Sequence, residues 1–158
     1  MIKEPTVRKA VELAVETETI GVKFYARIAK KFEDRPEIAE TFRRLSDDEK
    51  IHAARFEKIL EDAPENPPHV QSEPERLEYL RAVTRSSIFK GDTFKNLDEK
   101  VESMEDALQL AIDFEKSTLH VYLGLKDIVG EHEVIDRVIE EERKHIVRIF
   151  TMLERVRA

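Results

Sequence analysis

Two short segments of the chain pair a glutamate with a histidine three residues later, Glu49-x-x-His52 and Glu142-x-x-His145. Residues three apart lie on the same face of an α-helix, so the carboxylate and the imidazole of each segment can approach one metal ion together. Both pairs interrupt runs of apolar residues at helical spacing, which predicts that they point into the interior. These apolar residues are Phe42, Leu45, Phe56 and Leu60 in the first run, and Val138, Ile149 and Leu153 in the second. The pattern indicates a metal site inside the protein.

Two further glutamates fall on the predicted buried faces of other helical segments. Glu18 follows apolar residues at positions 11 and 14, and Glu115 follows apolar residues at positions 108 and 111. These intervals of seven and four residues keep each glutamate on the apolar side of its helix. Both carboxylates are therefore expected to join the buried site.

The two halves of the chain repeat each other around these residues. Glu18-x6-Tyr25 in the first half matches Glu115-x6-Tyr122 in the second, and the Glu-x-x-His segments match as well. Each half is therefore interpreted as one helical hairpin. Residues equidistant from a hairpin turn lie side by side, because each residue advances about 1.5 Å along its helix. The midpoint of positions 18 and 49 is 33.5, which falls at the predicted turn between Glu33 and Pro36. The midpoint of positions 115 and 142 is 128.5, beside the predicted turn at Gly130. The four glutamates are therefore expected at one level of the bundle.

Four ionised carboxylates in an apolar core would each cost several kcal/mol if they had no partner. Two divalent cations neutralise four carboxylates, and two neutral imidazoles complete the ligand set. In this hypothesis Glu49 and Glu142 bridge the metals, while Glu18 and Glu115 are terminal ligands beside the two histidines. Mixed carboxylate and imidazole ligands favour iron or manganese over copper or structural zinc. The predicted ligands are Glu18, Glu49, His52, Glu115, Glu142 and His145.

The elements that must position these residues are long helices. Apolar spacing predicts helices from Val7 to Phe32, from Ile38 to Leu60, and from Val134 to Val156, and another that begins with the capping pair Ser103 and Asp106 and stops at Gly130. Between the two hairpins, Pro64, Pro67, Pro68 and Pro74 mark an irregular connection, and Ser72-Glu73-Pro74-Glu75 is typical of a capping box before a shorter helix that runs to about Phe89. The predicted fold is an all-α four-helix bundle with a long crossover.

Composition excludes several other classes of protein. The 158 residues are 41% hydrophobic and 39% charged, with 34 acidic and 27 basic side chains, so no basic face for nucleic acid is expected. No segment approaches the roughly 20 apolar residues of a membrane span, and no signal-peptide core is evident, so we expect a cytoplasmic protein without a membrane partner. The absence of cysteine excludes thiolate metal sites and iron–sulfur clusters within these residues.

In these motifs the sequence resembles the ferritin-like superfamily, and most closely the di-iron domain of the rubrerythrin family. The resemblance extends over nearly the whole chain, which implies one ferritin-like domain over residues 1–158. It further implies two iron ions, a homodimer, and a reaction range that covers reduction of hydrogen peroxide, reaction with dioxygen and oxidation of ferrous iron.

The sequence departs from that family pattern at two places. Typical rubrerythrins carry an additional glutamate three residues after the ligand of the third long helix, where this chain has Thr118. They also carry a rubredoxin domain with four cysteines, whereas this chain has none, so electrons are expected from an external donor protein. We therefore expect a di-iron oxidoreductase that reduces peroxide or dioxygen. The alternative is a non-enzymatic protein that binds iron, manganese or a mixed pair for storage or ferroxidase-like use.

Several residues near the predicted site have more than one interpretation. Tyr25 and Tyr122 either hydrogen-bond the ligand carboxylates or pack in the core with a hydroxyl at its rim. Glu141 is expected to be exposed or to lie behind the metal ligands. The remaining histidines are expected outside the site, at a helix boundary for His120 and in loops or at helix starts for His69 and His132.

Overall fold

The computed structural model describes residues 7–62, 74–85 and 97–158. Within these ranges the chain forms α-helices and no strand, which confirms the all-α prediction. The elements in chain order are α1 (Val7–Lys31), α2 (Pro36–Asp62), α3 (Pro74–Arg85), α5 (Leu97–Lys100), α6 (Met104–Val129) and α7 (Glu133–Arg157). Among the described residues no helix is both long and apolar enough to span a membrane.

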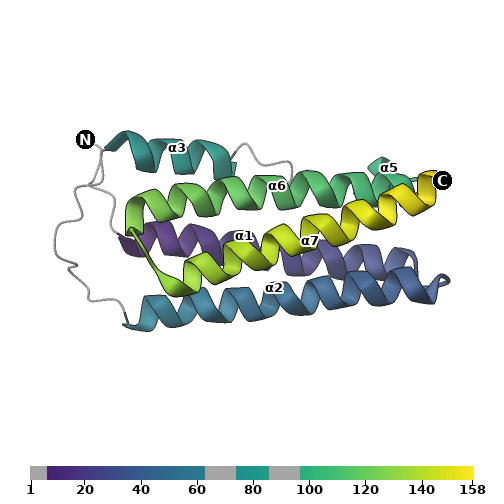
Figure 1. Ribbon diagram of the computed structural model, residues 1–158, viewed down its shortest axis with the longest axis horizontal. Helices are drawn as coiled ribbons and strands as arrows, with labels where there is room; N and C mark the ends of the chain where they lie inside the picture. Colours follow the sequence, from purple (N-terminus) through teal and green to yellow (C-terminus); the bar gives the residue numbers. More distant parts are fainter. Residues whose placement is uncertain (1–6, 63–73, 86–96) are drawn as a thin grey trace.

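The long helices form a ferritin-like bundle of two hairpins (Figure 1). α1 packs along α2, and α6 packs along α7, as the internal repeat predicts. α1 also contacts α6, and the short helix α3 lies against α6 and α1. α2 and α7 contact each other over a much shorter stretch. These are the two helices that carry the Glu-x-x-His segments.

The ends of the helices follow from local sequence. α2 begins at Pro36, whose fixed φ suits the first position of a helix. The Ser103 side chain accepts a hydrogen bond from the backbone N–H of Asp106, and the Asp106 side chain accepts one in return, so the predicted capping box of α6 is confirmed. Gly130 ends α6 with a φ of 84°, which is a backbone conformation that glycine adopts at little cost.

Two details of the crossover differ from the sequence prediction or lie outside the described residues. The four-residue helix α5 was not predicted, because a single turn gives no apolar periodicity to detect. The described part of the short helix ends at Arg85, and the predicted extension towards Phe89 lies outside the described residues. The prolines at positions 64, 67 and 68 and the first two residues of the predicted capping box, Ser72 and Glu73, lie outside them as well.

The apolar core is divided into two clusters with a polar layer between them. One cluster is built around Phe24, Phe42 and Ile149, and the other around Phe56 and Tyr122. The buried charged and imidazole side chains come from the middle turns of the four long helices, between the residues of these clusters. The helical spacing of the apolar residues thus brings the polar groups to one level of the bundle.

Candidate metal centre

The structure brings all six predicted metal ligands together in the middle of the bundle. Each long helix contributes, and none of the six residues is more than 4% exposed. The contributions are Glu18 from α1, Glu49 and His52 from α2, Glu115 from α6, and Glu142 and His145 from α7. Their role as metal ligands stays a prediction, whereas their convergence is a property of the fold.

The six residues form two overlapping groups. In the first group, ligand atoms of Glu18, Glu49, His52 and Glu142 all lie within 4.8 Å of one another. In the second group, the same holds for Glu49, Glu115, Glu142 and His145. Glu49 and Glu142 belong to both groups, so each can place one oxygen towards either metal. This grouping agrees with the prediction of two shared and two terminal carboxylates.

The two imidazoles turn their Nδ1 atoms towards the carboxylates. His52 Nδ1 lies 3.0 Å from Glu142 Oε1 and 3.5 Å from Glu18 Oε1. His145 Nδ1 lies 3.1 Å from Glu142 Oε2 and 3.4 Å from Glu115 Oε1. The rings stack with their centroids 5.7 Å apart. When the imidazoles are neutral, each Nδ1 can offer its lone pair to one metal of the pair.

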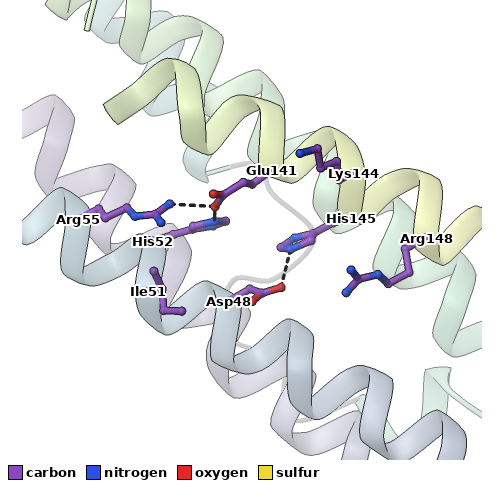
Figure 2. Close-up of a pocket in the computed structure, with 8 residues that line it drawn as sticks. All are labelled: Asp48, Ile51, His52, Arg55, Glu141, Lys144, His145 and Arg148. Atoms are coloured by element: carbon purple, nitrogen blue, oxygen red, sulfur yellow. Dashed lines mark hydrogen bonds and ion pairs between the residues drawn. The ribbon is translucent and has the colours of Figure 1, made fainter. Parts of the chain in front are cut away.

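The other ring nitrogen of each histidine is held by a carboxylate from the opposite hairpin (Figure 2). His52 Nε2 lies 2.6 Å from Glu141 Oε2, and His145 Nε2 lies 3.1 Å from Asp48 Oδ2. Arg55 Nη1 donates to the same oxygen of Glu141 over 2.9 Å. A carboxylate at Nε2 fixes the proton there and leaves Nδ1 free to coordinate, which is the usual arrangement behind a metal-bound histidine.

Of the two expectations for Glu141, the structure thus agrees with a position behind a predicted ligand, His52. It also places Asp48, which the sequence analysis missed, behind His145. A signal was present, since an acidic residue directly precedes the glutamate of both Glu-x-x-His segments: Asp48 before Glu49 and Glu141 before Glu142. Each half therefore carries an acid-Glu-x-x-His pattern. The first acidic residue of this pattern contacts Nε2 of the histidine in the other half.

The two buried tyrosines also form hydrogen bonds between the two hairpins. The Tyr25 hydroxyl on α1 donates to Glu115 Oε1 on α6, and the Tyr122 hydroxyl on α6 donates to Glu18 Oε1 on α1. Both rings are fully buried. Of the two interpretations of these tyrosines, the hydrogen bond to a carboxylate of the predicted ligand set is therefore correct.

Several buried carboxylate oxygens have no hydrogen-bond donor among the described residues. They are Glu18 Oε2, both oxygens of Glu49, and Glu115 Oε2. An unsatisfied buried charge is costly, so these carboxylates must either bind protons or share a cation. A pair of divalent cations fits this requirement, since all three of these glutamates belong to the two groups of candidate metal ligands.

Burial and crowding change the pKa values of these groups when no metal is bound. Burial, with the charges of Glu49 and Glu142, raises the pKa of Glu18 well above its usual range. Burial and the charge of Glu142 raise the pKa of Glu115 to about 8. For Glu142, burial opposes ionisation, yet hydrogen bonds from Glu115 and the two histidines leave its pKa below the usual value.

The pKa values of the two histidines are raised, although burial by itself would lower them. Burial alone lowers the pKa of His52 and of His145, but hydrogen bonds to the surrounding carboxylates outweigh it and raise both pKa values. Without metal, the site is therefore neutralised by protons on the histidines and on part of the carboxylates. Metal binding must displace those protons.

The other histidines lie outside this cluster within the described residues. His120 sits in the middle of α6 with an exposed side chain, and its ring centroid lies 5.9 Å from that of Tyr79. The prediction of a helix boundary at His120 was wrong, because α6 continues unbroken to Val129. His132 caps the start of α7, as expected, and His69 lies outside the described residues.

A comparison with protein-family models finds one match, to the family described as Rubrerythrin, over residues 9–105. A search of curated proteins and a search of solved structures each return no match. The matched segment covers more than half of the chain and includes Glu18, Glu49 and His52. Glu115, Glu142 and His145 follow it, but the internal repeat and the bundle geometry bring them to the same site. The chain belongs to the rubrerythrin family of ferritin-like di-metal proteins.

Proposed function

We propose that the protein is a di-iron oxidoreductase that reduces hydrogen peroxide. The observation that carries this proposal is the pair of overlapping ligand groups that share Glu49 and Glu142. Two shared carboxylates would hold two metal ions side by side, so that both could act on the two oxygens of one small molecule. A storage site for single ions does not need this sharing.

When bound, a ferrous pair supplies one electron from each ion, so that peroxide, two electrons and two protons give two molecules of water. The six predicted ligands would hold the pair, and the residues that contact these ligands set their orientation. Glu141 and Asp48 keep the proton of each histidine on Nε2, which leaves both Nδ1 atoms facing the centre. Tyr25 and Tyr122 hold Oε1 of the terminal glutamates.

The hydroxyl protons of these tyrosines stay on the phenol oxygens. Burial raises the pKa of Tyr25 and of Tyr122, and the charge of the glutamate that each contacts raises it further. Each tyrosine therefore stays protonated and donates a hydrogen bond to its glutamate, and does not compete as a phenolate for the metal. The carboxylates keep one oxygen oriented and the other available for metal.

The site lies closest to the surface at its two histidines. A pocket of about 220 Å³ opens between α2 and α7 above their Nε2 edges, and Ile51, Lys144 and Arg148 form part of its wall (Figure 2). The 158 residues contain no cysteine, so they hold no iron–sulfur centre that could return electrons to a ferric pair. In this proposal, a separate donor protein supplies those electrons.

The test is stopped-flow spectroscopy of the di-ferrous protein, prepared without oxygen and mixed with peroxide or with dioxygen. Rapid oxidation by peroxide supports the proposal. Glu49→Gln should lose the reaction together with the metals, while Glu57→Gln, an exposed change on the same helix, should leave it intact. Metal analysis of protein purified without oxygen identifies the bound ions and separates iron from manganese.

A non-enzymatic function is the second candidate, and Thr118 is the observation that favours it. At the position of the additional family glutamate, Thr118 adds no carboxylate to either ligand group. If the di-ferrous protein binds two ions per chain but reacts with neither oxidant, the protein is a metal-binding protein and the oxidoreductase proposal is wrong.

A further inference from the structure

The internal repeat of the sequence continues past the histidine of each Glu-x-x-His segment to an arginine. Arg55 follows His52 by three residues, and Arg148 follows His145 by three residues, so each half reads acid-Glu-x-x-His-x-x-Arg. Residues three apart lie on one face of a helix. Both arginines accordingly line the pocket between α2 and α7 (Figure 2). From the repeat alone, the two arginines are expected to make the same contacts.

Arg55 contacts the carboxylate that lies behind His52. Its Nη1 donates a hydrogen bond over 2.9 Å to Glu141 Oε2, the same oxygen that lies 2.6 Å from His52 Nε2. The side chains of Arg55 and Glu141 are 31% and 33% exposed, so solvent screens this ion pair only in part. A second partner also restricts the torsions of the glutamate side chain. Arg55 therefore fixes the Glu141 carboxylate against the His52 ring.

The corresponding arginine, Arg148, makes no such contact within the described residues. Asp48 Oδ2 lies 3.1 Å from His145 Nε2, and no lysine or arginine in the described ranges pairs with Asp48. Arg148 is exposed and has no ion-pair or hydrogen-bond partner in the same ranges. Aspartate has fewer torsions than glutamate, but the Asp48 contact is longer and its side chain is 39% exposed. The carboxylate behind His145 is therefore held less firmly than the carboxylate behind His52.

This difference separates the two predicted metal positions, because the two histidines belong to different ligand groups. His52 lies in the group with Glu18, and His145 lies in the group with Glu115. Each group otherwise offers the same residue types, one terminal and two shared glutamates. Each terminal glutamate also accepts a hydrogen bond from one buried tyrosine. How firmly the histidine is held is thus a difference between two otherwise similar positions.

We infer that Arg55 is a positioning residue, and that through Glu141 it makes the metal position at His52 the first of the two to be filled. This inference rests on the di-metal site of the proposed function and not on its oxidant. An imidazole whose Nε2 side is already fixed loses less freedom when its Nδ1 binds an ion. The positive charge of Arg55 alone opposes a nearby cation, but the Glu141 carboxylate pairs with it and offsets this effect.

The first test adds zinc in steps to metal-free protein whose histidines are labelled with ¹⁵N. Zinc takes carboxylate and imidazole ligands and has no redox chemistry, so the experiment reports binding alone. The Nδ1 NMR signal of His52 should shift during addition of the first ion per chain, and that of His145 during addition of the second. Simultaneous shifts of the two signals, or an earlier shift at His145, would overturn the inference.

The second test measures the affinity for the first zinc ion by competition with a chelating dye. Arg55→Leu should lower this affinity by about 3- to 10-fold, less than loss of a direct partner of the histidine, because Arg55 acts only through Glu141. Arg55→Lys keeps a cationic donor and should retain the affinity within about 2-fold. The matched control is Arg148→Leu, which removes the arginine at the equivalent position of the repeat and should change the affinity by less than about 2-fold.

Two results of the second test would contradict the positioning role. A higher affinity in Arg55→Leu would mean that repulsion by the Arg55 charge outweighs its effect on Glu141. Equal losses in the two leucine variants would mean that general charge around the pocket sets the affinity. In Arg55→Leu the signals of His52 and His145 should also shift together as zinc is added, which a purely structural role of Arg55 does not produce.

The tests separate this inference from the proposed function. If zinc fills the position at His52 first and Arg55→Leu removes this order, the inference holds even when the di-ferrous protein reacts with no oxidant. If the di-ferrous protein reacts rapidly with peroxide but the two histidine signals shift together, the function stands and the inference is wrong. If neither histidine signal shifts as zinc is added, the predicted ligand set and the inference are both wrong.

Discussion

The Tyr25 hydroxyl donates to Oε1 of Glu115, a residue 90 positions later in the chain and in the other hairpin. Tyr122 makes the reciprocal contact with Glu18. Each hairpin thus supplies the hydrogen-bond donor that orients a predicted metal ligand of its partner. Because these bonds are fully buried, the two hairpins are joined at the level of the site by polar contacts as well as by apolar packing.

Replacing either tyrosine by phenylalanine should weaken both the fold and the site. Tyr25→Phe leaves Glu115 without its donor, and Tyr122→Phe does the same to Glu18. We expect the free energy of unfolding of the metal-free protein to fall by about 1–3 kcal/mol in each variant, as for a buried acceptor that loses its partner. Denaturant titration measures this change. Tyr79→Phe, at a residue that is 48% exposed, is the control and should differ from the natural protein by less than about 0.5 kcal/mol.

The carboxylates behind the histidines should control metal affinity without contacting the metals. Asp48→Ala and Glu141→Ala remove the groups that hold Nε2 of His145 and His52. We expect metal affinity to fall by roughly 10- to 100-fold in each variant, because the imidazoles are no longer fixed. Competition titration with a chelating dye measures the affinity.

The chain offers a matched control beside each of these residues. Asp47 and Glu140 are exposed neighbours whose carboxylates pair with Lys50 and Arg143 on the protein surface. Asp47→Ala and Glu140→Ala should leave metal affinity within about 2-fold of the natural value, since exposed pairs contribute little. An equal loss in the control variants would mean that general charge around the site, and not the contact with Nε2, sets the affinity.

Shared and terminal glutamates should differ in how many ions they affect. Glu49 belongs to both ligand groups and Glu18 to one. Glu49→Gln should therefore weaken binding of both ions, whereas Glu18→Gln should weaken mainly one and leave about one ion per chain. Metal analysis after dialysis gives this stoichiometry. Retention of one tightly bound ion by Glu49→Gln would contradict the shared role.

The same Glu49→Gln change should stabilise the metal-free protein, because it removes a buried charge whose oxygens lack donors. In the presence of metal, the variant should instead be less stable than the natural protein, since bound metal stabilises the folded state by an amount that increases with the logarithm of its affinity. Thermal melting with and without metal measures both effects. Equal melting temperatures for natural protein with and without metal would be inconsistent with a buried di-metal site.

The metal-free protein should lose stability as pH rises. Burial raises the pKa of Glu18, and it raises that of Glu115 from 4.5 to about 8, so between these values the folded state binds more protons than the unfolded state. The free energy of unfolding therefore falls as pH increases through this window, by an amount on the order of a few kcal/mol. The raised pKa values of His52 and His145 act in the same direction above about pH 6.5, where only the unfolded histidines lose their protons.

Metal binding should show the opposite dependence. Ions displace protons from the same carboxylates and histidines, so metal affinity increases with pH. The difference in melting temperature between metal-loaded and metal-free protein should therefore grow from about pH 5 to about pH 8. Below about pH 4.5 the lowered pKa of Glu142 reverses the trend of the metal-free protein, whose stability then decreases as pH falls, since protonation of Glu142 removes stabilising contacts with both histidines. A difference that stays constant over the window would show that these groups do not exchange protons for metal.

The sequence by itself determined the long helices and the level of the site. Helical periodicity fixed which side of each helix is buried, and equal distances from two turns fixed the heights of Glu18, Glu49, Glu115 and Glu142. Local signals also sufficed for the capping box at Ser103 and the glycine that ends α6. These features depend on neighbours within one helix or one hairpin, and the sequence shows such neighbours directly.

Only the tertiary structure decided which side chains meet across the two hairpins. Three features join residues from helices in different halves of the chain. They are the contact of Asp48 with His145, the reciprocal hydrogen bonds of the two buried tyrosines with glutamates of the other hairpin, and a small cavity beside Thr118. Such contacts depend on how far each helix is rotated about its axis and how closely it approaches its neighbours. Side-chain packing in three dimensions sets these quantities, and residue spacing along the chain does not.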